Sequence, residues 1–109
     1  MVLNIPPPKV DAGPIEAQVD ALADALAVLR SPQEARALLA DLCTPAEVRS
    51  LAERWQVARL LDVGDLTYRQ IHDATGVSTT TIVRVARFLR QEGNGGYRIL
   101  LDRARKRGR

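Results

Sequence analysis

The chain has 109 residues, enough for one compact domain, and it is rich in alanine, leucine and arginine, which favour helices. No long alternating run of β-branched residues is present, so the composition predicts an all-α fold. Residues 1–65 carry 6 basic and 10 acidic residues, whereas residues 66–109 carry 10 basic and 3 acidic residues. This basic second half is typical either of a protein that binds a polyanion such as nucleic acid or of a soluble protein with a basic tail.

Targeting and redox chemistry are constrained by what the sequence lacks. The first 14 residues, MVLNIPPPKVDAGP, have no apolar core, so no signal peptide is expected. No run reaches the roughly 18 apolar residues that would predict a membrane span, and the expected location is therefore cytoplasmic. Cys43 is the only cysteine, so no disulfide can form within the chain, and we predict that it is a small buried hydrophobic residue.

The N-terminal part of the chain is predicted to contain a flexible arm and two helices. Four of the six prolines fall in residues 1–14, which predicts the arm. A helix is expected from residue 15, because apolar residues recur there in steps of four and three: Ile15, Val19, Leu22, Leu26 and Leu29. Ser31 with Glu34 three residues later, and Pro32 at the first helical position, marks the start of the second helix.

Four more helices are predicted in the rest of the domain. The pairs Thr44/Glu47 and Thr67/Gln70 have the capping-box spacing and start the third and fourth helices, which end at Gly64 and Gly76. The apolar positions of the third helix are Val48, Leu51, Trp55, Ala58 and Leu61.

The last two helices lie on either side of a glycine-rich break. Ser78 caps a fifth helix that runs to about Gln91. The GNGG of residues 93–96 interrupts the chain, and a short sixth helix follows from Tyr97 to about Lys106. The predicted domain therefore spans residues 15–106, and residues 107–109 end a basic tail that would add nonspecific affinity for DNA or remain a solvated terminus.

The fourth and fifth helices have the helix-turn-helix pattern. A short helix, a turn containing Gly76 and a longer helix follow one another within residues 67–90. Gly76 can adopt the left-handed conformation that such a turn needs. The two helices are expected to pack through four apolar residues: Ile71, Val77, Ile82 and Val85. Short αα-hairpins that do not bind DNA share this pattern, so both interpretations remain open.

The fifth helix has one apolar face and one polar face. At 100° per residue, Val85, Ala86 and Leu89 fall near Ile82 on the packed face. The opposite face carries Thr80, Arg84 and Arg87, with Val83 beside it. A recognition helix places its N-terminal residues at the base edges, where short hydroxyl side chains allow close approach. The row of hydroxyls from Ser78 to Thr81 therefore favours DNA contact by Thr79 and Thr80, although Ser78 alone would explain an N-cap.

Residues 41–103 resemble the tryptophan repressor superfamily, in particular its YerC/YecD-type branch. The resemblance rests on DLCTPAEVRSLAERWQVARLL, on the G-x-x-T-Y-x-x-I pattern from residue 64, on TGVSTTTIVRV, and on GNGGY followed by LDR at 101–103. It implies six helices, an intertwined homodimer and two helix-turn-helix heads that read a symmetric site. It also implies DNA contacts at Tyr68, Arg69, His72, Thr79, Thr80 and Val83, where Val83 replaces a common serine; the capping residues Thr67 and Ser78 and the outward Arg84 and Arg87 complete the predicted DNA-binding set.

In the tryptophan repressor, the indole of the corepressor lies between two arginines. The matching residues here are Arg54 and Arg84, with Thr44 and Thr81 nearby, so these four form a candidate ligand site. However, Val85 and Phe88 stand where that pocket needs a glycine and a serine. We therefore expect that tryptophan does not bind, and no cofactor is predicted.

No arrangement of residues suggests catalysis. No paired acids, no Ser/His/Asp set and no phosphate-binding glycine loop are present, and His72 has no second ligand to form a metal site. The sequence therefore predicts a homodimeric transcriptional repressor that binds double-stranded DNA and is not an enzyme. The alternative is a helical adaptor that binds another protein through the same exposed face.

Overall fold

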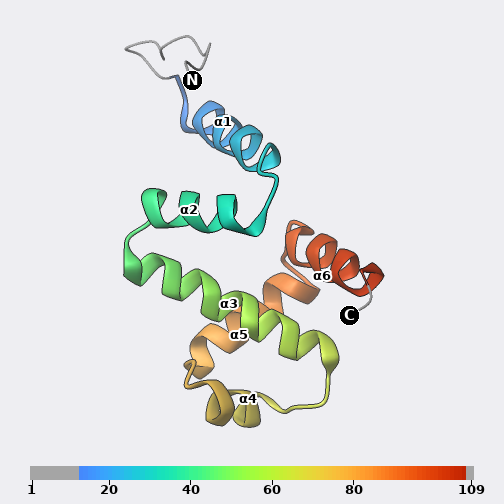
Figure 1. The fold of residues 1–109 in the computed structure, drawn as a ribbon. Helices are drawn as coiled ribbons and strands as arrows, with labels where there is room; N and C mark the ends of the chain where they lie inside the picture. Colours follow the sequence, from blue (N-terminus) through green and yellow to red (C-terminus); the bar gives the residue numbers. More distant parts are fainter. Residues whose placement is uncertain (1–12, 108–109) are drawn as a thin grey trace. The chain divides into compact units, whose positions relative to one another are not determined.

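The computed structural model describes residues 13–107, in which all regular secondary structure is helical. The helices are α1 (Ile15–Ala27), α2 (Pro32–Leu42), α3 (Pro45–Val63), α4 (Tyr68–Thr75), α5 (Thr79–Arg90) and α6 (Gly96–Lys106) (Figure 1). The all-α prediction is confirmed, and each helix begins within one residue of its predicted start. The predicted arm, residues 1–14, lies outside the described residues except for Gly13 and Pro14, and only Arg107 of residues 107–109 is described.

The chain divides into two compact units at residues 42 and 43. The first unit contains α1 and α2, and neither helix buries a residue. The apolar stripe predicted for α1 is exposed: Ile15 by 62%, Val19 by 56%, Leu22 by 40% and Leu26 by 47%. Leu29 does not belong to that helix, because α1 ends at Ala27.

The start of α2 differs in detail from the predicted capping box. Ser31 Oγ accepts a hydrogen bond from the Glu34 N–H at 3.1 Å, as expected for the cap. The Glu34 carboxylate, however, accepts from the N–H of Arg30 at 2.8 Å and not from that of Ser31. The Glu34 carboxylate therefore binds the backbone N–H one residue before the one that a capping box uses. The two hydrogen bonds still satisfy two backbone N–H groups at the start of the helix.

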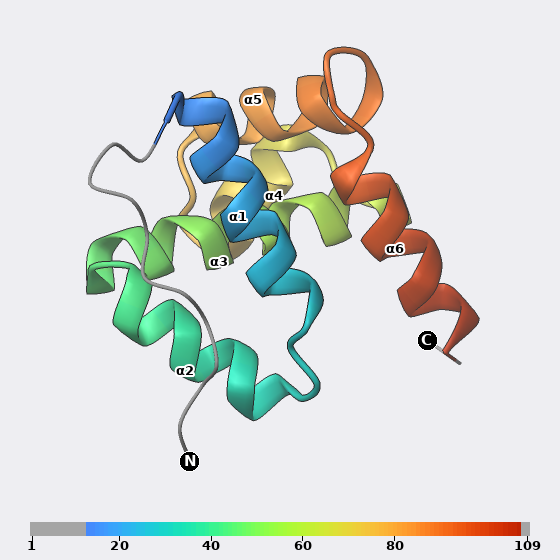
Figure 2. The same ribbon diagram turned by 90° about the horizontal axis from the view of Figure 1, so that it is seen from above.

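The second unit packs α4, α5 and α6 around the C-terminal half of α3. Its core consists of eight buried residues: Val57, Ala58, Leu61, Ile71, Val77, Ile82, Val85 and Ala86. In both views α5 crosses α3, and α4 packs beside α5 (Figures 1 and 2). The four apolar residues predicted to join the two helices of the motif are all buried, which confirms that packing.

Only part of the apolar stripe of α3 is buried, and the prediction for Cys43, just before the helix, was wrong. Leu51, an apolar position of that stripe, is 44% exposed, whereas Val57, which lies outside the stripe, is fully buried. The reason is that the buried residues of α3 all lie in its C-terminal half, where it packs against α5, and Leu51 precedes that half. Cys43 is half-buried rather than buried, because it lies before the first turn of α3 and lines an open hollow on that helix.

The turn between α4 and α5 is held by side chains as well as by its glycine. Gly76 has a φ of 77°, the left-handed conformation predicted for it. Thr75 Oγ1 donates to the carbonyl of Ile71 at 2.7 Å and accepts from the N–H of Val77 at 3.1 Å. His72 Nδ1 lies 2.8 Å from the carbonyl oxygen of Val77, which can only accept, so Nδ1 is the donor. These bonds fix the angle at which α5 leaves α4.

One carboxylate on α3 holds two arginines of α6. Asp62 is only 12% exposed, and its two oxygens accept from Arg98 at 2.9 Å and from Arg105 at 2.6 Å. Burial has the largest single effect on the pKa of Asp62 and raises it. The hydrogen bonds and charges of the two guanidinium groups together outweigh burial, so the pKa lies below its ordinary value of 3.8.

This lowered pKa predicts how the stability of the unit depends on pH. Because the folded pKa of Asp62 is depressed, its contribution is complete above the ordinary value of 3.8 and is lost as the pH falls through the folded value. The difference in unfolding free energy between the wild type and Asp62→Asn should therefore be constant above about pH 5 and shrink below it. Urea unfolding of both proteins from pH 7 to pH 3 measures this difference. A difference that grew on acidification would contradict the assigned pairing.

Candidate nucleic-acid interface

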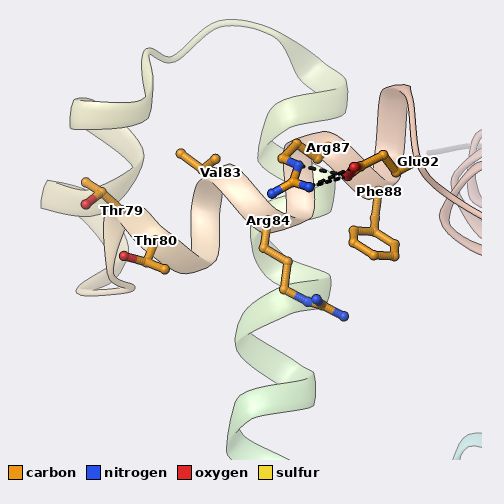
Figure 3. A pocket seen from close by; sticks show the side chains of 7 residues that line it. All are labelled: Thr79, Thr80, Val83, Arg84, Arg87, Phe88 and Glu92. Atoms are coloured by element: carbon orange, nitrogen blue, oxygen red, sulfur yellow. Dashed lines mark hydrogen bonds and ion pairs between the residues drawn. The ribbon is translucent and has the colours of Figure 1, made fainter.

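The exposed face of α5 forms the candidate interface. Ser78 caps the helix, since its Oγ accepts from the Thr81 N–H at 3.2 Å. Thr79 and Thr80 are exposed in the first turn, and Val83, which is 43% exposed, follows on the same face. These residues line one open hollow of about 660 Å³ (Figure 3), whose full lining is Thr79, Thr80, Val83, Arg84, Arg87, Phe88 and Glu92. The predicted division of α5 into a packed face and an outer face is confirmed.

Two arginines of this face are held in different ways. The guanidinium carbon of Arg84 lies 4.4 Å from the centre of the Phe88 ring, a cation–π contact one helical turn apart. Arg87 makes a bidentate ion pair with Glu92, which follows the end of α5. The outer face thus presents two oriented arginines beyond the threonines of the first turn.

The start of α4 adds a third arginine to the motif. The Arg69 side chain is 82% exposed, and its Nε lies 3.5 Å from the Asp73 carboxylate on the next turn. Tyr68 is 38% exposed, and its hydroxyl accepts a hydrogen bond from Arg90 at 3.4 Å. Both predicted contact residues at this end are therefore accessible on the surface of the motif.

Three residues of the predicted DNA-binding set have structural roles. Thr67 Oγ1 accepts from the Gln70 N–H at 3.1 Å and caps α4. Ser78 caps α5, and its hydroxyl also donates to Thr81 Oγ1 at 3.0 Å. His72 is half-buried and supports the turn through its bond to Val77. Their roles in positioning are clear from these bonds, whereas a direct contact with DNA remains a prediction.

The two arginines of the candidate ligand site line different hollows. Arg84 lines the hollow on α5, whereas Arg54 lines a second one, on the N-terminal half of α3, with Cys43 and Leu51. Thr44 caps α3, and Thr81 is half-buried against Ser78. Val85 is 1% exposed, so it points into the core as predicted, and Phe88 occupies the space beside Arg84.

The family model for the Trp repressor protein matches residues 17–105. The chain belongs to the Trp repressor family. This is a family of DNA-binding regulators and not of enzymes. The resemblance found in the sequence is thereby confirmed, and the match extends over more of the N-terminal unit than the motifs suggested.

Three similar proteins support the assignment to the Trp repressor family. The uncharacterized protein YerC of Bacillus subtilis strain 168 is 42% identical over 89 residues, which cover 82% of this chain and 84% of YerC. A Staphylococcus aureus structure, of a protein proposed to be a Trp repressor, has a TM-score of 0.74 and 42% identity over 82% of this chain and 87% of that one. A TrpR-like protein from Eubacterium eligens ATCC 27750 has a TM-score of 0.72 and 39% identity over 80% and 88% of the two chains.

Tryptophan should not switch this member of the Trp repressor family. The face of Arg84 that an indole would stack on is already in contact with the Phe88 ring, and Val85, where the pocket needs a small residue, is buried in the core. Titration with L-tryptophan to millimolar concentration should give only the heat of dilution seen with L-leucine. A saturable heat together with tighter DNA binding would contradict this expectation.

Between residues 13 and 107, no group of three or more metal-ligating side chains occurs, and no helix has the length and apolarity of a membrane span. Two features of the interface escaped the sequence reasoning, namely the Arg87–Glu92 pair and the Arg84–Phe88 stack. The spacing of four within α5 could have indicated the stack, whereas the ion pair depends on how the chain turns after the helix.

Proposed function

We propose that the protein is a cytoplasmic transcriptional repressor that binds a specific double-stranded DNA site with its helix-turn-helix. The observation that carries this proposal is the polarity of α5. Ile82, Val85 and Ala86 are buried against α3 and α4, while Thr79 and Thr80 are exposed at the start of the helix. A recognition helix needs this arrangement, because its N-terminal residues must reach the base edges while its other face is anchored.

The charges around the motif favour DNA over other partners. Residues 66–109 carry 10 basic and 3 acidic residues, and four of the arginines lie on α4 and α5: Arg69, Arg84, Arg87 and Arg90. Phosphate contacts position a protein on the duplex, and base contacts specify the sequence. We assign Arg69 to a guanine edge and the arginines of α5 to flanking phosphates, with Thr79, Thr80 and Val83 at the bases.

Selection from a pool of random duplexes tests this proposal. The bound sequences should converge on a two-fold symmetric motif with half-sites about 10 base pairs, one helical turn, or a multiple apart. A pool that is retained without any convergence would mean that the protein binds DNA only nonspecifically. No retention at moderate salt would favour the alternative, an adaptor whose arginines meet acidic residues of a protein partner.

We also propose that the active form is a homodimer. The apolar stripe of α1 is 40% to 62% exposed, and Ile99 and Leu100 of α6 are 51% and 54% exposed. A chain with this much unburied apolar surface on amphipathic helices has material for an interface. Two copies would present two recognition helices, which matches a symmetric site.

Light scattering measures the assembly directly. At micromolar concentration we expect the mass of two chains, about 24 kDa, from twice the 12.0 kDa of one chain. Because α1 supplies the exposed stripe, the double substitution Leu22→Asp and Leu26→Asp should shift the mass toward a monomer. A wild type that remained monomeric would contradict the proposed dimer.

A further inference from the structure

A carboxylate beside the proposed DNA-reading surface holds one of its arginines. Arg87 Nε donates to Glu92 Oε2 at 2.8 Å, and Arg87 Nη2 lies 2.7 Å from Oε1 and 2.6 Å from Oε2. The two side chains are 57% and 47% exposed, so the pair lies on the surface, at the rim of the hollow on α5 (Figure 3). Because two separate nitrogens of Arg87 bind the two oxygens, the pair uses the geometry that gives arginine its strongest contacts with carboxylate and phosphate.

The backbone after α5 is built to bring Glu92 to this place. The helix ends at Arg90, and the N–H groups of both Gln91 and Glu92 donate to the carbonyl of Arg87, at 2.8 and 2.9 Å. The next residue, Gly93, passes so close to the backbone of Phe88 that an added Cβ would overlap the Phe88 carbonyl oxygen. Only glycine fits there without a shift of the chain. The backbone of the turn that carries Glu92 is therefore held by hydrogen bonds and by close packing against Phe88.

Glu92 also differs in charge from the other residues that line the hollow on α5. It is the one acidic side chain among the residues that line the hollow on α5. Arg84, which lines the same hollow, stacks on the Phe88 ring and makes none of the ion pairs found in residues 13–107. The hydrogen bond from Arg87, with the charge of that group, keeps the pKa of Glu92 below its ordinary value, so the carboxylate stays charged at neutral pH.

We propose that Glu92 is a built-in competitor of DNA phosphate for Arg87. This inference rests on the proposed function. In the free protein the carboxylate occupies the guanidinium fork, and a phosphate that reaches Arg87 must displace it, because both anions use the same donors. Glu92 thus weakens the binding of Arg87 to any duplex, and most of the affinity for random DNA comes from such phosphate contacts. Its effect is to limit nonspecific binding.

Glu92→Gln tests the competition on a nonspecific duplex. The probe is a duplex of about 20 base pairs, two helical turns, with no symmetric motif. Its affinity for the wild type, Glu92→Gln, Arg87→Gln and the double variant is measured at 0.15 M salt, where the screening length is about 8 Å. Glu92→Gln should bind about three- to fivefold more tightly, the upper range for release of an exposed ion pair. In the Arg87→Gln background the same substitution should change the affinity by less than about 1.5-fold.

Asp65→Asn is the control for the loss of a negative charge. Asp65 is exposed in the loop between α3 and α4, and its substitution removes the same charge without touching Arg87. Equal tightening by Glu92→Gln and Asp65→Asn would overturn the proposal, since general charge would then explain both. Weaker binding by Glu92→Gln would also overturn it, because the carboxylate would then orient Arg87 toward DNA. If the wild type and every variant bind no duplex, the proposed function fails instead. A cooperative thermal unfolding transition for each variant confirms that it is folded.

Discussion

Ile82→Ala should destabilise the helix-turn-helix unit by about 2–5 kcal/mol, the usual cost of truncating a fully buried isoleucine. Ile82 is 0% exposed and lies in the core cluster that joins α3, α4 and α5. The substitution leaves a cavity at the point where the DNA-reading helix is anchored. For a unit of this size each kcal/mol lowers the melting temperature by about 4–8 °C, so the shift should exceed about 8 °C.

Val83→Ala is the matched control for this prediction. Val83 is the next residue of α5, is also β-branched, and is 43% exposed on the outer face. Its truncation should change stability by no more than about 0.5 kcal/mol, as expected for a surface position. Both variants are compared at one protein concentration, because dimerisation would make the melting temperature depend on concentration. Equal shifts for the two variants would contradict the assigned orientation of α5.

The sequence specifies most of this fold because its local signals agree with one another. Thr44 and Thr67 each sit at the start of a helix, and Glu47 and Gln70 return the predicted bonds to them. The helix boundaries follow from these caps and from Gly64 and Gly76. Which face of a long helix is buried is a tertiary property, and this explains why the apolar stripe of α3 indicated neither the exposure of Leu51 nor the burial of Val57.

The interface was predictable where it depends on one helix and not where it depends on a turn. The outward direction of Thr80, Arg84 and Arg87 follows from a period of 3.6 residues. The partner of Arg87 does not, because Glu92 lies beyond the end of α5 and its position depends on how the chain passes Phe88. The same limit applies to Asp62, whose two arginine partners lie 36 and 43 residues away along the chain.

Arg69→Ala should weaken binding to the selected DNA site by about 1–3 kcal/mol, roughly five- to 150-fold, while its effect on random DNA should be much smaller. The reason is the assigned role of Arg69 in reading a guanine. Its guanidinium can bind the O6 and N7 acceptors of that base at once, and its side chain is 82% exposed at the start of α4, where only a weak contact with Asp73 at 3.5 Å must be given up.

Arg49→Ala provides a closely matched comparison for Arg69→Ala. Arg49 lies on α3, outside the helix-turn-helix, and its side chain is also 82% exposed, with the Glu53 carboxylate at 3.4 Å one turn away. Loss of Arg49 removes the same charge and the same kind of ion pair, so it should reduce affinity for both DNAs only slightly and equally. Competition gel shifts with the selected site and a scrambled site measure both effects. If Arg69→Ala lowers the affinity for the two DNAs equally, Arg69 contacts phosphate and does not read a base. Loss of a residue that reads a base lowers the affinity for the selected site far more than the affinity for a scrambled site.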